Sequence, residues 1–190
     1  MTLPPLLLLD VDGVLNALAD YDEHLEVWPD WKSGHATADG TSWPITWAPE
    51  VIGQLRTWHE SGSVELQWLT TWGHDANGEL RELLGLPGLA VAGTYDDGLP
   101  AINDPAATSH ADVAPAAPDP LTGQWWKYDV VLKVLQEHPE RVIIWVDDEL
   151  HDGTSRFRQW ADQHDRVLAV GPDPRSGLAS HDVLRIMEIL

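Results

Sequence analysis

The sequence contains no cysteine, few basic residues and no long apolar run, and each lack excludes a class of protein. Without cysteine, the chain cannot form a disulfide, a zinc–thiolate site or a cysteine nucleophile. Only 11 lysine and arginine residues stand against 31 aspartate and glutamate residues, which gives a net charge of −20. A basic surface for nucleic acid or anionic lipid is therefore not expected. No apolar stretch approaches the length that spans a membrane.

The rest of the composition is that of a globular protein with a strong acidic excess. A chain of 190 residues that is 43% hydrophobic suits a single domain, residues 1–190, with a full core. Residues 1–9 are apolar but short and lack a basic region, which is typical of a buried strand and not of a signal peptide. We therefore expect a cytoplasmic protein. The acidic excess serves either solubility or a group of carboxylates that holds a cation.

Short apolar segments predict strands, and the amphipathic segments between them predict helices. The expected strands are Leu6–Val11, Val64–Leu69, Arg141–Val146, Val167–Val170 and, with the weakest pattern, Leu89–Ala92. The expected helices are Pro49–Glu60, Asn77–Leu84, Tyr128–Glu137, Ser155–Gln163 and Ser180–Leu190. This alternation predicts an α/β fold with a mostly parallel sheet flanked by helices.

Two segments interrupt this alternation and are predicted to be insertions. Residues 16–48 have mixed polarity, and the Asp39-Gly40 pair between extended segments predicts a β-hairpin there. This insertion is large enough for a small flap that follows the first strand. Residues 93–124 are rich in Pro, Ala, Asp and Gly and predict a long loop, which is usually functional or mobile in a compact domain.

Three of the predicted strands end in residues that can do chemistry. The pairs are Asp10 with Asp12, Thr70 with Thr71, and Asp147 with Asp148. Ligands of open parallel sheets bind beyond the carboxyl ends of the strands, so the fold would bring these groups together. Crowded carboxylates need a cation, and oxygen ligands of this kind suit Mg²⁺. One carboxylate can attack phosphorus, and a second can protonate the leaving oxygen.

The order of these groups resembles that of the haloacid-dehalogenase (HAD) superfamily. Asp10-Val11-Asp12-Gly13-Val14-Leu15 resembles its first motif, DxDGxL. Leu69-Thr70 resembles the second motif, and Lys127 is the best candidate for the third. Trp145-Val146-Asp147-Asp148 resembles the acidic fourth motif. The resemblance covers nearly the whole chain and implies a Rossmann-like core.

The resemblance also implies the chemistry of a magnesium-dependent phosphatase. In that chemistry Asp10 is the nucleophile and a metal ligand. Asp12 is the general acid and base, and its backbone carbonyl contacts Mg²⁺. Thr70 holds the transferring phosphoryl group, and Lys127 steadies the nucleophile and the phosphoryl charge. Since relatives with dehalogenase or phosphonatase chemistry replace the second aspartate, the presence of both favours a phosphatase.

The fourth motif implies the remaining metal ligands. Asp148 ligates Mg²⁺ directly, and Asp147 or the later acid Asp152 supports it, in part through water. The sequence leaves open which of Asp147 and Asp148 is the direct ligand.

Other residues near these motifs are candidates for substrate contact. Thr71 is an alternative to Thr70 as the phosphate-binding hydroxyl, and Gly13 allows a sharp turn after the two acids. Trp72 and Trp126 are candidates for the wall of a pocket. The tryptophans of the first insertion have a simpler interpretation, which is that they pack it onto the core. They are Trp28, Trp31, Trp43 and Trp47.

These observations predict a Mg²⁺-dependent phosphomonoesterase that acts on a small phosphorylated metabolite or nucleotide. One alternative is a phosphatase for polynucleotide ends or phosphoproteins, although the net charge of −20 opposes nucleic acid. Another alternative is a non-catalytic module that keeps the metal site, because fold alone does not fix function. The sequence leaves open the substrate, the oligomeric state and whether residues 93–124 close over the site.

Overall fold

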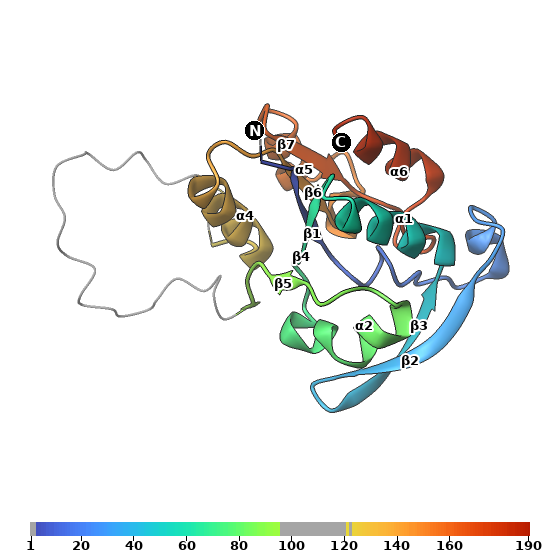
Figure 1. Cartoon of the computed structure of the whole chain (residues 1–190). Coiled ribbons are helices and arrows are strands. Elements are labelled where there is room, and N and C mark those ends of the chain that lie inside the picture. The colour runs from blue at the N-terminus through green and yellow to red at the C-terminus, as the bar shows by residue number, and fades with distance from the viewer. Residues whose placement is uncertain (1–2, 96–120, 122) are drawn as a thin grey trace, which may run out of the picture.

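A five-stranded parallel sheet lies at the centre of the protein, as the computed structural model in Figure 1 shows. The structure describes residues 3–95, 121 and 123–190. The strand order is β5-β4-β1-β6-β7. The strands are β1 (Leu6–Leu9), β4 (Glu65–Trp68), β5 (Ala90–Val91), β6 (Ile143–Val146) and β7 (Val167–Val170). The prediction of an α/β fold with a parallel sheet is thereby confirmed.

Helices cover both faces of the sheet, which explains why β1 is a continuous run of leucine. Leu6 and Leu8 pack in the same apolar cluster as residues of α4 (Trp126–Glu137) and α5 (Arg156–Ala161). Leu7 and Leu9 point to the other face, in a cluster with residues of α1 (Pro49–Glu60) and α6 (Ser180–Met187). Successive strand residues face opposite sides, so a strand buried on both faces has no polar positions.

Four helices have boundaries that differ from the prediction. α4 begins at Trp126 and not at Tyr128, and α5 spans Arg156–Ala161 and not Ser155–Gln163. The helix predicted over Asn77–Leu84 begins only at Glu79, as α2 (Glu79–Leu84), because Asn77 is the last residue of a preceding 3-10 helix, η2 (Gly73–Asn77). Gly78 separates them with a ψ of −128°, which is not helical. The last helix, α6, ends at Met187 and not at Leu190.

A β-hairpin follows β1 and the 3-10 helix η1 (Asp22–Leu25), within the predicted insertion. Its strands are β2 (Lys32–Ala38) and β3 (Thr41–Trp47), which pair antiparallel. Asp39 and Gly40 form the turn, with φ values of 50° and 71°. Two positive φ values are typical of the two-residue hairpin turn that Asp-Gly favours. Figure 1 shows the hairpin extending past α2.

The predicted loop over residues 93–124 lies mostly outside the described residues, because the structure describes neither 96–120 nor 122. Within the described part of the chain, no helix is long and apolar enough to cross a membrane.

Candidate active site

The register of the sheet brings three chain segments together at the carboxyl ends of its strands. Leu9 at the end of β1 lies opposite Trp68 of β4 and Val146 of β6. The backbone N–H of Asp10 donates to the carbonyl of Val146 at 3.1 Å. The residues that follow these three strands therefore emerge side by side, as the parallel sheet predicts.

Lys127, near the start of α4, joins two of these strand ends. Its Nζ donates to Asp10 Oδ2 at 2.5 Å and to Asp147 Oδ2 at 2.8 Å. All three side chains are buried. The other oxygen of Asp147, Oδ1, accepts from the backbone N–H of Glu149 at 3.1 Å and so caps the 3-10 helix η3 (Asp148–Leu150). The structure thus places Lys127 in contact with the residue predicted to be the nucleophile.

A third carboxylate completes a group that could bind a metal ion. Asp10, Asp147 and Asp148 each offer an oxygen, and these oxygens all lie within 4.8 Å of one another. Although burial by itself lowers the pKa of Lys127, Asp147 and Asp10 hold that pKa above its usual range. Burial raises the pKa of Asp147 to about 8 despite the nearby ammonium of Lys127. Burial and the charge of Asp10 raise the pKa of Asp148 to about 6.

Besides the burial of Asp147, the unequal number of charges in the group explains these opposite preferences. Lys127 gains two anionic partners, so it favours its charged form, whereas Asp147 shares its ammonium with Asp10 and also faces Asp148. Among the described residues, this group has three carboxylates and one ammonium, so its net charge is negative when all of them are ionised. Either a proton or a cation relieves the repulsion, and an oxygen-lined group of this size suits a hard divalent ion.

Gly13 makes room for the third carboxylate. Its φ is +71°, and a Cβ at this position would lie 2.5 Å from Cγ of Asp148. Its backbone N–H donates to the carbonyl of Asn16 at 2.9 Å. The geometry thus supports a role for Gly13 in the turn and in the close approach of Asp148, while its contact with substrate stays a prediction.

Asp152 does not join the group of three carboxylates. Its side chain is exposed and accepts hydrogen bonds from the hydroxyl of Thr154 at 2.6 Å and from the N–H of Thr154 at 2.8 Å. These hydrogen bonds hold the pKa of Asp152 below its usual value. The turn after η3 therefore directs this acid toward its own backbone, and the geometry gives no support to the predicted metal role.

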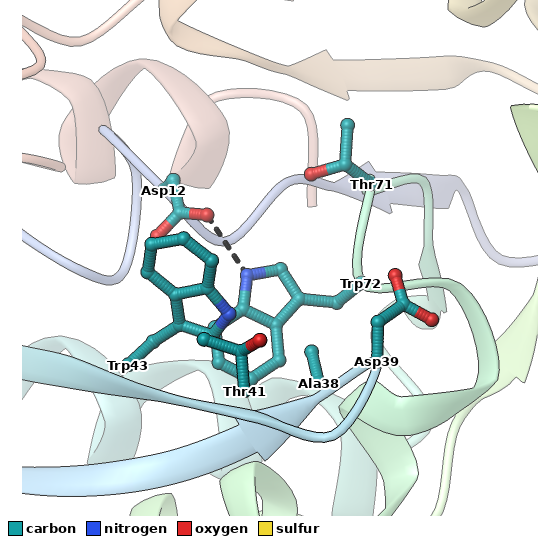
Figure 2. A pocket seen from close by; sticks show the side chains of 7 residues that line it. All are labelled: Asp12, Ala38, Asp39, Thr41, Trp43, Thr71 and Trp72. Carbon is teal, nitrogen blue, oxygen red and sulfur yellow. Dashed lines mark hydrogen bonds between the residues drawn. The ribbon is translucent and has the colours of Figure 1, made fainter.

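Asp12 lies outside the carboxylate group and has neutral partners. Its Oδ2 accepts from Trp72 Nε1 at 2.8 Å, which Figure 2 shows as a dashed line. Its Oδ1 accepts from Asn16 Nδ2 at 2.8 Å. The amide of Asn16 is oriented by Thr46 of the hairpin, whose backbone N–H donates to Asn16 Oδ1 at 2.8 Å. Asn16 and Trp72 thus each donate a hydrogen bond to a different oxygen of Asp12, and together they orient its carboxylate.

The sequence does not indicate the contact of Asn16 with Asp12 or the hydrogen bond from the indole of Trp72. Asn16 is four residues after Asp12, but the segment is not helical, so no periodic pattern indicates the contact. Trp72 was predicted as a pocket wall from its position after the second motif. The structure gives it that position and, in addition, a hydrogen bond to Asp12.

A pocket of about 300 Å³ opens beside Asp12 (Figure 2). It is lined by Asp12, Thr71 and Trp72 of the core and by Ala38, Asp39, Thr41 and Trp43 of the hairpin. Thr71 is exposed there, whereas Thr70 is buried and its Oγ1 accepts from the N–H of Trp72 at 3.3 Å. The two threonines therefore have different environments, and the choice between them as the phosphate-binding hydroxyl stays a prediction.

Trp126 does not line this pocket. Its ring lies 6.0 Å from Nζ of Lys127 and contacts the ring of Tyr95 edge-on, with centroids 6.4 Å apart. Of the tryptophans of the first insertion, Trp28, Trp31 and Trp47 pack on the core, as the simpler interpretation predicts, whereas Trp43 is half exposed and lines the pocket. The indole of Trp28 donates to the carbonyl of Leu178 at 2.7 Å.

The raised pKa values predict a pH-dependent response to Mg²⁺. Because the folded pKa of Asp148, about 6, lies above its usual value, the cation-free protein loses stability as the pH rises from about 4 through 6. Asp147 extends this loss to about pH 8. A cation bound to the ionised carboxylates offsets it. In thermal unfolding, we expect Mg²⁺ to raise the melting temperature by several degrees near pH 8 and little near pH 5.

Two asparagine variants test the source of this response. Asp148→Asn removes a ligand, so it is expected to abolish the shift with Mg²⁺ and to raise the melting temperature without it at neutral pH. Asp162→Asn changes an exposed carboxylate that pairs with Arg158, and it is expected to keep the shift. A shift of equal size at all pH values, or one retained in Asp148→Asn, would contradict the assignment.

Comparison with known proteins agrees with this geometry. Residues 6–183 match the family described as the HAD domain in Swiss Army Knife RNA repair proteins. The search of curated proteins and the search of solved structures gave no significant match. The family match spans the sheet, the hairpin, Lys127 and all the strand ends described above, and it confirms the resemblance to the HAD superfamily. The chain therefore belongs to the HAD-domain family of Swiss Army Knife RNA repair proteins.

Proposed function

We propose that this protein is a Mg²⁺-dependent phosphomonoester hydrolase that works through an aspartyl-phosphate at Asp10. The observation that carries the proposal is the buried contact of Lys127 with both Asp10 and Asp147, beside a third carboxylate. Membership in a family of HAD domains supports hydrolase chemistry. A purely structural ion pair would have no use for the third acid, Asp148.

The nucleophile is held at both of its oxygens. Asp10 Oδ2 accepts from Lys127, and Asp10 Oδ1 accepts from the N–H of Val11 at 2.7 Å. In the first step a carboxylate oxygen of Asp10 attacks phosphorus, and the bond from phosphorus to the ester oxygen breaks. Because the pKa of Lys127 lies above its usual range, the ammonium stays charged and balances the transferring phosphoryl group.

Asp12 would transfer the protons of both steps. It gives a proton to the leaving ester oxygen as the alcohol departs. It then takes a proton from the water that attacks phosphorus, which releases phosphate and restores Asp10. Asn16 and Trp72 hold Asp12 outside the metal-binding carboxylates, so its charge and proton are separated from theirs.

The donor set fits a magnesium ion. Asp10 and Asp148 would hold it, and Asp147 would support them, because both oxygens of Asp147 already accept hydrogen bonds. When bound, Mg²⁺ supplies positive charge to the phosphoryl oxygens in the transition state.

The substrate has two candidates. The composition favours a small phosphorylated metabolite or nucleotide over a long polyanion. The family description, in contrast, places such HAD domains in RNA repair proteins, which makes RNA with a terminal phosphate the second candidate. A net charge of −20 opposes contact with many phosphates at once, but it does not prevent a site from taking one terminal phosphate.

Removal of the nucleophile tests the reaction. We expect Asp10→Asn to lower hydrolysis of p-nitrophenyl phosphate with Mg²⁺ by roughly a thousandfold or more, because the covalent step is lost. The panel of substrates includes nucleoside monophosphates, sugar phosphates, phosphopeptides and oligoribonucleotides with a 5′- or 3′-terminal phosphate.

Asp162→Asn again serves as the matched control and is expected to keep the native rate. Absence of turnover by the native protein on the whole panel would favour the alternative of a non-catalytic module. Activity retained in Asp10→Asn would remove this residue from the mechanism.

The hydrogen bond from Trp72 to Asp12 predicts a dependence on the leaving group. Trp72→Phe keeps a ring but loses the indole N–H, so Asp12 is less well placed to protonate the leaving oxygen. We expect kcat/KM for an alkyl phosphate to fall about tenfold, a part of the 10²–10⁴ that general acid catalysis contributes. Hydrolysis of p-nitrophenyl phosphate, whose leaving group needs no proton, is expected to change much less.

Trp28→Phe is the control for this variant, because it removes an indole N–H bond that lies away from Asp12. A loss of the same size on both substrates would show that Trp72 acts on the fold and not on proton transfer.

A further inference from the structure

We propose that the pocket beside Asp12 is a subsite for a nucleobase, namely that of the nucleoside which carries the scissile phosphate. This inference rests on the proposed phosphatase function and extends it to the class of leaving group. The pocket lies between the β2–β3 hairpin and the segment that follows β4.

The position of Asp12 places the pocket on the leaving-group side. A general acid must lie within hydrogen-bond reach of the oxygen that it protonates. The group attached to that oxygen therefore extends into the space that Asp12 borders, which is this pocket. Asp10, Asp147 and Asp148 do not line it, so the phosphoryl group and its cation lie elsewhere in the site.

The indole of Trp43 gives the pocket an exposed aromatic wall. Trp43 alternates with Ile45 and Trp47 along β3, and both of these are buried, so Trp43 belongs to the inner face of the hairpin. It is nevertheless 50% exposed. Figure 2 shows its ring and that of Trp72 in the pocket near Asp12. An indole that faces inward and stays half exposed is available to stack on a planar group.

The other lining residues favour a neutral group with N–H donors. Among the described residues that line the pocket, none is basic, and Asp12 and Asp39 are acidic. A second phosphate or a carboxylate in the substrate would therefore be repelled. Asp39 and the hydroxyls of Thr41 and Thr71 can accept from the N–H groups at the edge of a base.

The size of the pocket limits its occupant. Its volume of about 300 Å³ is at the lower end of small-molecule sites, which span roughly 300–1,000 Å³. Ala38, one of the lining residues, has a small side chain and leaves this space open. A space of this size favours a single nucleoside, and a longer strand would extend out of it after the first unit.

The hairpin is fastened in place, so the aromatic wall exists before a ligand binds. The backbone N–H of Asp39 at its tip donates to Asp75 Oδ2 at 2.9 Å, in η2. Farther along β2, Gly34 contacts α2 so closely that a Cβ there would lie 2.7 Å from Leu83 Cδ1. A preformed site loses little ordering free energy on binding, which favours recognition by stacking.

Substitution of Trp43 tests the subsite. The substrates are adenosine 5′-monophosphate, a short oligoribonucleotide with a terminal phosphate, and glycerol 2-phosphate, which has no base. We expect Trp43→Ala to lower kcat/KM for the two nucleotide substrates about 10- to 100-fold and to leave glycerol 2-phosphate unchanged. Trp43→Phe keeps a stacking ring and is expected to retain most of the nucleotide activity.

Tyr21→Ala is the matched control, because it removes an exposed ring of the same insertion that does not line the pocket. A loss confined to the oligoribonucleotide would still support the subsite and would identify a strand end as its source. Equal losses on all three substrates, or unchanged nucleotide activity in Trp43→Ala, would overturn the proposal.

A binding measurement distinguishes a failure of the subsite from a failure of the proposed phosphatase function. Isothermal titration calorimetry measures adenosine 5′-monophosphate binding to Asp10→Asn protein with Mg²⁺, with and without Trp43→Ala. If the native protein hydrolyses no substrate, the proposed function fails. Weakening of the nucleotide Kd by about tenfold or more in the double variant would still support the subsite. Unchanged affinity, or no binding to Asp10→Asn, would overturn it.

Discussion

The ammonium of Lys127, buried between Asp10 and Asp147, is the interaction on which the site depends. It fixes α4 against the ends of β1 and β6 and gives the nucleophile its orientation. A buried ion pair does little for stability by itself, since desolvation offsets much of the attraction. The third carboxylate, Asp148, increases the repulsion further. The cluster is best explained as a binding site that a cation and a phosphoryl group complete. Without them, the repulsion among the carboxylates lowers the stability of the folded protein.

The sheet explains why such a cluster can form at all. β1 lies between β4 and β6, so whatever follows it has neighbours on both sides. The leucines of β1 are buried on both faces of the sheet and anchor the strand whose end carries Asp10. The hairpin adds a second layer, because Thr46 orients Asn16 and Asn16 holds Asp12. Trp72 connects the two layers, since it bonds to Asp12 and also borders the pocket.

Much of this arrangement could be predicted from the sequence. The apolar runs, the acids at their ends and the Asp39-Gly40 turn follow local rules of periodicity and backbone conformation. Lys127 was predicted from the order of the motifs, and the structure places it beside Asp10. These features depend on short segments and on the general rule that parallel strand ends converge.

Other features depend on how side chains meet across the fold, and the sequence does not specify that. Asp152 has the right spacing in the sequence for a metal ligand, but its carboxylate accepts hydrogen bonds from the N–H and the hydroxyl of Thr154 in the same turn. Trp43 was assigned to packing together with the other tryptophans of the first insertion, because the sequence does not show where the core ends. The half-exposed ring of Trp43 is evident only once the hairpin is placed over Asp12.

The most direct test of the account is to trap the phosphorylated enzyme. Native protein and Asp12→Asn are mixed with radiolabelled p-nitrophenyl phosphate and Mg²⁺, quenched in acid and mapped by mass spectrometry. The account predicts a phosphoryl group on Asp10 that accumulates in Asp12→Asn, because no base activates water there, and that is absent in Asp10→Asn. Turnover without any covalent label, or a label on another residue, would contradict it.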